Sequence, residues 1–281
     1  MLDPAKITRR ETAMLGAIAG DIIGSRFERS NIKSTDFELF TNQSRFTDDS
    51  VMTLAIADAI LLCDGEYEPL GRQAIRCMQR MGRLYPDAGY GGRFAEWLKK
   101  SRPWPYHSYG NGAAMRVSPC GFAAASLEEA VTLARKVTEV THNHPEGMKA
   151  AEAVTAAIFL ARTGTPMADI RRHIEEAYYT IDFTLDDIRP DYEFDVSCQG
   201  SVPQAFEAFF ESAGFEDAIR NAISIGGDSD TIGAITGSMA EAYYGVPTDL
   251  RQQALAFLDE TQLGILNAFE AAYGHKREAT H

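Results

Sequence analysis

Apolar residues recur along most of this chain at spacings of three and four, which is the pattern of a helix with one buried face. The period-two alternation typical of strands is nearly absent. The periodic segments predict helices over residues 13–24, 51–62, 70–84, 92–100, 127–140, 146–161, 201–212, 215–225, 231–244 and 248–273, with a further helix starting at Thr165-Pro166. The predicted fold class is therefore all-α, with few strands or none.

Two of the predicted helices have unusual faces. The helix over 13–24 carries Gly16, Gly20 and Gly24 four residues apart, so one of its faces can let another backbone approach closely. The helix over 51–62 is apolar almost all round, as expected in the middle of a core. The first pattern predicts a tight helix contact, and the second predicts a central helix.

The organisation of the sequence predicts a single domain. No repeat, low-complexity stretch or linker rich in proline and serine divides it. A chain of 281 residues can bury a large core, and we expect residues 1–281 to form one compact domain. The least regular parts are residues 32–46, 101–112 and 183–200. A functional site is expected there, because loops on a rigid scaffold usually carry the chemistry.

The composition is that of an ordinary globular protein with an acidic surface. Hydrophobic residues make up 45% of the chain, charged residues make up 24%, and the net charge is −13. This charge argues against an extended nucleic-acid-binding surface, which needs clustered Lys and Arg. A small molecule that carries phosphate remains compatible with it, if a metal or a glycine-rich backbone supplies a local positive field.

Cysteine usage and the start of the sequence predict a cytoplasmic protein. The four cysteines are scattered and form no CxxC pair, as expected of free thiols in a reducing compartment. The apolar run that follows Arg9-Arg10 is interrupted by Asp21, so we do not expect a targeting signal there. No stretch of the sequence is apolar for long enough to predict a membrane span.

Two short acidic strings lie directly before predicted helices. They are Thr47-Asp48-Asp49-Ser50 and, behind Gly226-Gly227, Asp228-Ser229-Asp230-Thr231. Helix capping explains either string alone, since a carboxylate in a first turn is stabilised by about 0.3–1 kcal/mol. Together the strings offer four carboxylates, which two divalent ions would neutralise. Their oxygen-only chemistry suits Mg²⁺, Mn²⁺ or Ca²⁺ rather than zinc, so capping and a joint metal site are both open.

Two further carboxylates stand near the glycine-faced helix. Glu28, just beyond its end, is either a solvated loop charge or a mobile general acid or base. Asp21 lies inside an apolar segment, where a buried carboxylate needs a partner. Asp21 is expected either to contact the ligands of a metal site without binding the metal itself, or to cap a helix inside the protein.

Two loop segments carry groups suited to a ligand. In Ser108-Tyr109-Gly110-Asn111-Gly112, backbone amides could meet a pyrophosphate, and nearby aromatic rings could stack on a base. The segment lacks the strand and helix that would make it a dinucleotide fingerprint or a P-loop. The HxH pair in Thr141-His142-Asn143-His144-Pro145 has no matching Cys/His set for zinc. A histidine that contacts substrate or caps the following helix is expected instead.

At these residues the chain resembles the ADP-ribosylglycohydrolase family, and the resemblance is collinear over most of its length. The matching segments are residues 15–24 (the opening helix), 46–49 (the first metal string), 109–116 (the ribose and phosphate loop), 141–145 (the histidine motif) and 226–231 (the second metal string). Two metal strings and two further motifs in the same order make the resemblance specific.

The resemblance implies an all-α, single-domain orthogonal helical bundle with a central cleft that holds two Mg²⁺ ions, or two Mn²⁺ ions. The implied metal ligands are Thr47, Asp48, Asp49, Asp228, Asp230 and Thr231. The implied ADP-ribose contacts are Ser108, Tyr109, Gly110, Asn111, Gly112 and His142. Glu28, Asp49 and Asp230 are the candidate catalytic carboxylates.

The implied activity is metal-dependent hydrolysis of the glycosidic bond between ADP-ribose and an acceptor. One alternative is a non-catalytic ADP-ribose-binding protein, and another is a hydrolase of a different nucleoside or glycoside. The acceptor and the oligomeric state are not determined by the sequence. Acceptor selectivity is expected to lie in the irregular segments 32–46 and 183–200.

Overall fold

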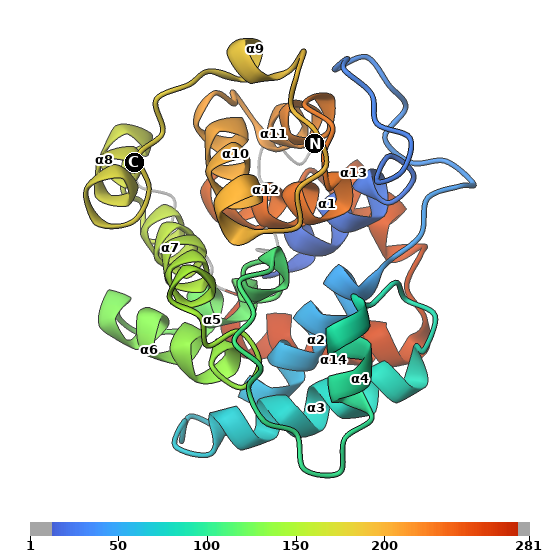
Figure 1. Cartoon of the computed structure of the whole chain (residues 1–281), viewed down its shortest axis with the longest axis vertical. Helices are drawn as coiled ribbons and strands as arrows, with labels where there is room; N and C mark the ends of the chain where they lie inside the picture. Colours follow the sequence, from blue (N-terminus) through green and yellow to red (C-terminus); the bar gives the residue numbers. More distant parts are fainter. Residues whose placement is uncertain (1–12, 275–281) are drawn as a thin grey trace, which may run out of the picture.

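The computed structural model describes residues 13–274, which fold into fourteen α-helices (Figure 1). These residues contain no strand, and their one isolated β-bridge joins Gly110 to Ser197. The helices are α1 (Leu15–Gly24), α2 (Asp48–Leu61), α3 (Leu70–Leu84), α4 (Gly92–Leu98), α5 (Ser118–Ala123), α6 (Leu127–Thr138), α7 (Pro145–Arg162), α8 (Met167–Ala177), α9 (Leu185–Ile188), α10 (Cys198–Phe210), α11 (Phe215–Ser224), α12 (Ser229–Tyr244), α13 (Thr248–Leu255) and α14 (Glu260–Tyr273). The all-α prediction is confirmed.

Glycines bring α1 and α12 into direct backbone contact. A Cβ atom added to Gly20 would lie 2.0 Å from the carbonyl oxygen of Gly233, and one added to Gly16 would lie 2.2 Å from that of Gly237. Neither position can hold a larger residue without moving the helices apart. The tight contact predicted from the glycine spacing of α1 is confirmed, and Figure 1 shows the two helices side by side.

Helix α2 lies in the core, as its apolar sequence predicts. Nearly every residue from Asp49 to Ile60 is buried, and the helix packs against α1, α3, α5 and α14. It begins at Asp48 rather than at Val51, because Thr47 caps it and the two aspartates form its first turn. The acidic string is therefore part of the helix and not of the preceding loop.

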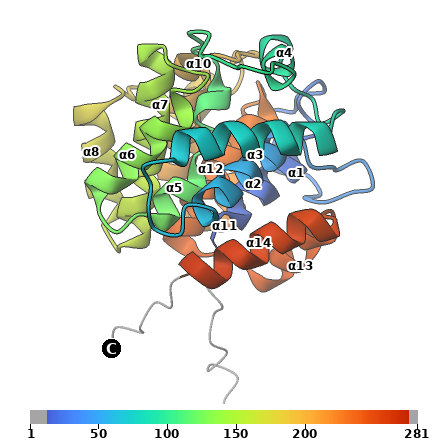
Figure 2. The same cartoon turned by 90° about the horizontal axis from the view of Figure 1, so that it is seen from below.

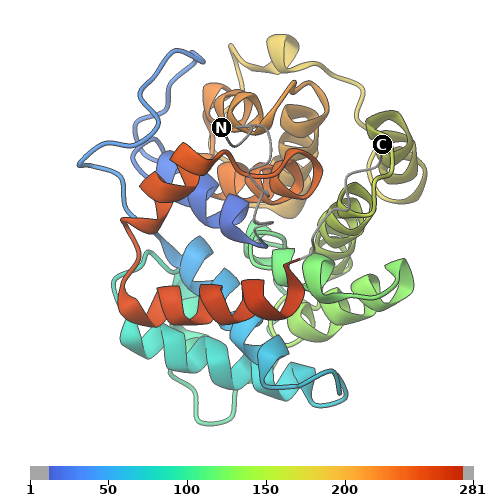
Figure 3. The ribbon, with the colours of Figure 1, turned by 180° about the vertical axis from the view of Figure 1, so that it is seen from behind.

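The prediction of one helix over 248–273 is wrong. The chain forms α13 and α14, and the break lies at residues 256–259. Asp259 starts α14 with a reciprocal cap: its carboxylate accepts from the Gln262 N–H, and the Gln262 side chain accepts from the Asp259 N–H, both at 3.0 Å. Figure 2 shows the two separate helices, and Figure 3 shows α14, in red, crossing the rear of the molecule.

The irregular segments lie mainly where the sequence places them. Residues 25–47 and 178–197 connect helices with little regular structure apart from the short helix α9. The short helices α5 and α9 are not predicted by the sequence pattern, because both are too short to show a helical period. Within residues 13–274, no helix has the length and apolar character that crossing a bilayer requires.

Two predictions concern residues outside the described range. The assignment of residues 1–281 to one domain includes both ends of the chain, and the absence of a targeting signal concerns the sequence around Arg9 and Arg10. Both stay predictions. For residues 13–274, the helices share one continuous hydrophobic core, which runs from Ala13 to Phe269.

Candidate metal centre and its pocket

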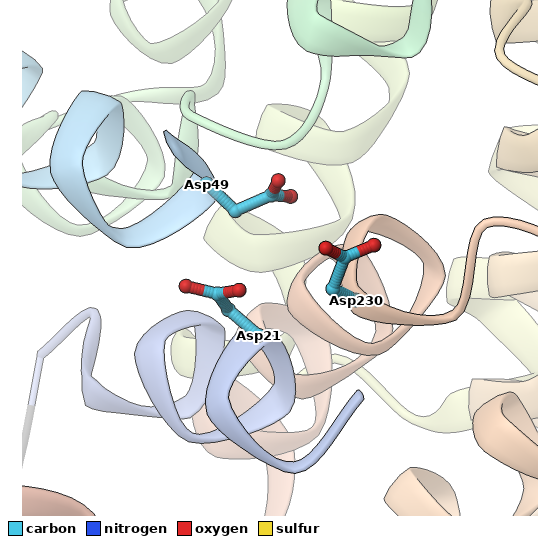
Figure 4. A group of neighbouring side chains, drawn as sticks. All are labelled: Asp21, Asp49 and Asp230. Carbon is cyan, nitrogen blue, oxygen red and sulfur yellow. The ribbon is translucent and has the colours of Figure 1, made fainter. Parts of the chain in front are cut away.

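Three buried carboxylates from three different helices meet inside the protein. Asp21 comes from α1, Asp49 from α2 and Asp230 from α12, and one oxygen of each lies within 4.8 Å of the others. Figure 4 shows the three side chains pointing toward one another. Among the described residues, this is the group of acidic, histidine or cysteine side chains that is arranged to hold a metal ion.

Local contacts fix the three helix ends around this cluster. At Gly24, the last residue of α1, an added Cβ would lie 2.5 Å from the Asp230 Cα, so α1 passes directly over the start of α12. Asp21 reaches the start of α2, where it accepts hydrogen bonds from the Thr47 N–H at 2.8 Å, the Thr47 hydroxyl at 2.6 Å, and the N–H and hydroxyl of Ser50. Asp21 thus caps α2 from inside the protein, which is one of the two roles expected for it.

The electrostatics of the cluster favour a cation. Burial raises the pKa values of Asp49 and Asp230 well above their ordinary value, and the charges of the neighbouring carboxylates raise them further. The buried Oδ1 of Asp49 has no hydrogen-bond partner in the described part of the chain. Carboxylates crowded in this way become stable when a positive charge lies between them, and an all-oxygen donor set fits a hard divalent cation.

The second acidic string follows a left-handed glycine turn. Gly226 and Gly227 both have φ of 74°, which is the left-handed region that favours glycine. The turn places Asp228 where the Asn111 side-chain amide donates to it at 2.7 Å, and it places the Thr231 hydroxyl 3.3 Å from Asp49 Oδ2. The two acidic strings, far apart in the sequence, therefore lie against each other.

A pocket of about 500 Å³ opens above the carboxylates, a size suited to a nucleotide-sized ligand. Almost all predicted site residues line it: Glu28, Thr47, Asp48, Asp49, Ser108, Gly110, Asn111, Gly112, His142, Asp228, Asp230 and Thr231. Burial raises the pKa of Asp48 to about 7 and also raises that of Asp228, and the nearby charge of Glu28 adds to both shifts. Glu28 therefore stands beside the acidic strings rather than out in solvent.

Tyr109 is the predicted site residue that does not line the pocket. Its side chain is 50% exposed and lies against His144, with ring centroids 5.3 Å apart, while its carbonyl accepts from the Cys198 N–H.

The two histidines of the HxH pair also separate. His142 is buried in the pocket wall, and burial lowers its pKa well below its ordinary value, so the ring is neutral. His144 caps α7 by accepting from the Glu146 N–H.

Other parts of the pocket wall were not assigned from the sequence. The segment 88–94 lies outside every segment in which the sequence places a site. Arg45, Tyr106, Phe194 and Val196 lie in the irregular segments expected to carry a site, and Arg116 lies in the ribose and phosphate loop, but none of them was assigned individually. The run Gly89-Tyr90-Gly91-Gly92-Arg93 was a usable signal, because clustered glycines mark a loop between helices, where a site is expected. Phe194 is 51% exposed at the pocket, although nothing in its local sequence distinguishes it from a residue of an ordinary loop.

The helices and the site define an all-α protein with a buried carboxylate cluster under a nucleotide-sized pocket. The ADP-ribosylglycohydrolase family matches residues 3–276, which is nearly the whole chain, so the chain belongs to that family. The family resemblance inferred from the sequence motifs is confirmed.

Named relatives and a solved structure are similar to most of this chain. ADP-ribosylhydrolase ARH3 of Mus musculus is 24% identical, over 92% of this chain and 90% of the relative. ADP-ribosylarginine hydrolase Tri1 of Pseudomonas putida (strain GB-1) is 26% identical, over 85% of this chain and 71% of the relative. A solved structure described as an ADP-ribosylglycohydrolase-related protein complex superposes with a TM-score of 0.71 at 25% identity, covering 95% of this chain and 97% of that chain.

Proposed function

We propose that this chain is a Mg²⁺-dependent hydrolase that cleaves the glycosidic bond between ADP-ribose and an acceptor and releases ADP-ribose. The observation that carries the proposal is the cluster of Asp21, Asp49 and Asp230 at the base of a nucleotide-sized pocket. Membership of the ADP-ribosylglycohydrolase family and similarity to two named ADP-ribosyl hydrolases support the same substrate class.

The metal would be held by oxygens of the two acidic strings. We assign Thr47, Asp48, Asp49, Asp228, Asp230 and Thr231 as its ligands. Asp21 also lies within reach, but its two oxygens already accept four hydrogen bonds from the start of α2. We therefore assign it chiefly to holding Thr47 and the first turn of α2 in place. A bound divalent cation would supply a Lewis acid that holds ribose hydroxyls and lowers the pKa of a water molecule.

The side chains of the pocket supply the remaining parts of the reaction. Glu28 lines the pocket beside Asp48 and Asp228, where its carboxylate can accept the proton of the attacking water. Asn111 and the neutral His142 offer hydrogen-bonding groups to the sugar. Arg45, Arg93 and Arg116 place positive charge on the wall of an otherwise acidic protein, which suits a pyrophosphate.

The direct test is a panel of ADP-ribosylated substrates incubated with the purified protein, with Mg²⁺ and with a chelator. The panel contains arginine-linked, serine-linked, nucleobase-linked and polymeric ADP-ribose. We expect at least one substrate to release ADP-ribose. The chelator should abolish this release, and added Mg²⁺ or Mn²⁺ should restore it.

Other outcomes of the panel point to other functions. Tight binding of ADP-ribose without release from any substrate would identify a non-catalytic ADP-ribose-binding protein. Turnover of another nucleoside or glycoside that ADP-ribose does not inhibit would identify a different hydrolase. Either result contradicts the proposal.

A further inference from the structure

The side chain of Asn31 is bonded to both backbone groups of Gly227. Its Oδ1 accepts from the Gly227 N–H at 2.8 Å, and its Nδ2 donates to the Gly227 carbonyl at 2.9 Å. The two residues are 196 positions apart in the sequence. One planar amide therefore satisfies a donor and an acceptor of the residue directly before Asp228.

The same Nδ2 group also contacts the turn that carries Glu28. It lies 2.6 Å from the carbonyl oxygen of Phe27 and 3.2 Å from that of Glu28. Glu28 and Asp228 both line the pocket, and Asn31 connects the backbone segments that hold them. The Asn31 amide is thus a direct hydrogen-bonded link between the turn that carries Glu28 and the second acidic string.

Other side chains support the glycine turn without reaching Glu28. The Lys33 ammonium donates to the carbonyls of Ile225 and Tyr192, both at 2.6 Å. The Tyr192 ring covers Gly227, where an added Cβ would lie 2.3 Å from the ring. Loss of the Asn31 amide would therefore leave the glycine turn supported from two sides, while the hydrogen bonds that join it to the Phe27 and Glu28 backbone would be lost.

We propose that Asn31 is a positioning residue that fixes the Glu28 carboxylate relative to Asp228 and the metal-binding turn. The inference rests on the proposed hydrolase function, in which Glu28 moves the proton. The amide chemistry is specific, because a carboxylate at this position would face the carbonyl oxygens of Phe27, Glu28 and Gly227. A misplaced general base lowers turnover more than it lowers binding.

Hydrogen exchange tests the link without any assay of activity. The variants are Asn31→Ala and, as a matched control, Asn42→Ala, which alters an exposed asparagine of the same interhelical segment. We expect amide exchange in peptides covering residues 27–33 and 225–230 to accelerate about tenfold in Asn31→Ala, because the Gly227 N–H loses its acceptor and the 27–33 turn loses the contacts that hold it closed. Asn42→Ala should leave both rates unchanged. Unchanged exchange at 225–230 in Asn31→Ala would overturn the proposal.

Steady-state kinetics with Mg²⁺ and the cleaved substrate then test the consequence for catalysis. We expect Asn31→Ala to lower kcat about thirtyfold and to change KM by less than about twofold. Adding Asn31→Ala to Glu28→Gln should cause almost no further loss, because Asn31 acts through Glu28. Fully additive losses, or a normal kcat, would overturn the positioning role. If the wild-type protein cleaves no substrate in the panel, the proposed function fails, while hydrogen exchange still decides whether Asn31 holds the two segments together.

Discussion

The carboxylate of Asp21 accepts two hydrogen bonds from Thr47, one from its N–H at 2.8 Å and one from its hydroxyl at 2.6 Å. This contact joins the middle of α1 to the residue that caps α2, and Asp49 lies only two residues farther on. Asp21 is therefore a structural cap and also a member of the carboxylate cluster. The two roles explain why an acidic residue is fully buried within a helix that is otherwise apolar.

We predict that Asp21→Ala destabilises the metal-free protein by about 3 kcal/mol. The substitution leaves the N–H and hydroxyl donors of Thr47 and Ser50 buried without an acceptor, at a cost of about 1–3 kcal/mol for each group that finds no water. Urea unfolding in the presence of a chelator measures this effect.

Asp49→Ala is the matched comparison, because it removes a carboxylate from the same cluster. Asp49 accepts only long hydrogen bonds, at 3.4 Å from Thr47 and 3.3 Å from Thr231, and its Oδ1 has no partner among the described residues. We expect its metal-free stability to be equal to that of the wild type or greater, while Mg²⁺ no longer stabilises it. Equal destabilisation by the two substitutions would contradict the capping role of Asp21.

The stabilising effect of Mg²⁺ should increase with pH. Burial and the nearby Asp21 carboxylate raise the pKa of Asp48 from its ordinary 3.8 to about 7, so between these values the unfolded chain has lost a proton that the metal-free folded protein keeps. The free energy of unfolding contributed by this group therefore falls as the pH rises from about 4 to 7. A bound cation favours the ionised Asp48 carboxylate and so removes this loss of stability at higher pH.

Thermal unfolding with and without saturating Mg²⁺, at pH values of about 5.5 and 8, measures the difference. We expect Mg²⁺ to add about 2 kcal/mol more stability at the higher pH. In Asp48→Asn the dependence on pH should become smaller. An effect of Mg²⁺ that is the same at both pH values would contradict the electrostatic account of the site.

Gly20→Ala should disrupt the contact that brings Asp21 toward Asp230. The new methyl group would lie 2.0 Å from the Gly233 carbonyl oxygen, so α1 and α12 would have to separate. We expect a loss of about 3 kcal/mol or more, together with weaker Mg²⁺ binding. Gly264→Ala is the control, because Gly264 lies inside α14 with no atom within 4 Å of an added Cβ. There, alanine should stabilise the helix by up to about 1 kcal/mol.

Much of this arrangement follows from local sequence. Apolar periodicity gives most helices, the spacing of Gly16, Gly20 and Gly24 gives the contact between α1 and α12, and Thr47 marks the start of α2. The two acidic strings could be paired because their residue chemistry matches. Each of these signals lies within a few residues, so a sequence pattern can carry it.

What the sequence could not give depends on contacts between distant residues. The cap that Asp21 provides to α2 was one of two expected roles, and only the packing of α1 against α2 selects it. The break between α13 and α14 was missed because Phe257 and Leu258 continue the apolar pattern across it, although Asp259 and Gln262 form a recognisable capping pair. The bond between Asn31 and Gly227 has no local signature at all.

The most direct test of the central claim, that the buried carboxylates form the catalytic metal centre, compares Asp230→Asn with Asp249→Asn. Both aspartates are the second residue of a helix, α12 and α13 respectively, but only Asp230 belongs to the cluster. The measurement is kcat/KM for ADP-ribose release at a fixed Mg²⁺ concentration. We predict a loss of at least about a hundredfold for Asp230→Asn and no change for Asp249→Asn. Wild-type turnover by Asp230→Asn would contradict the account.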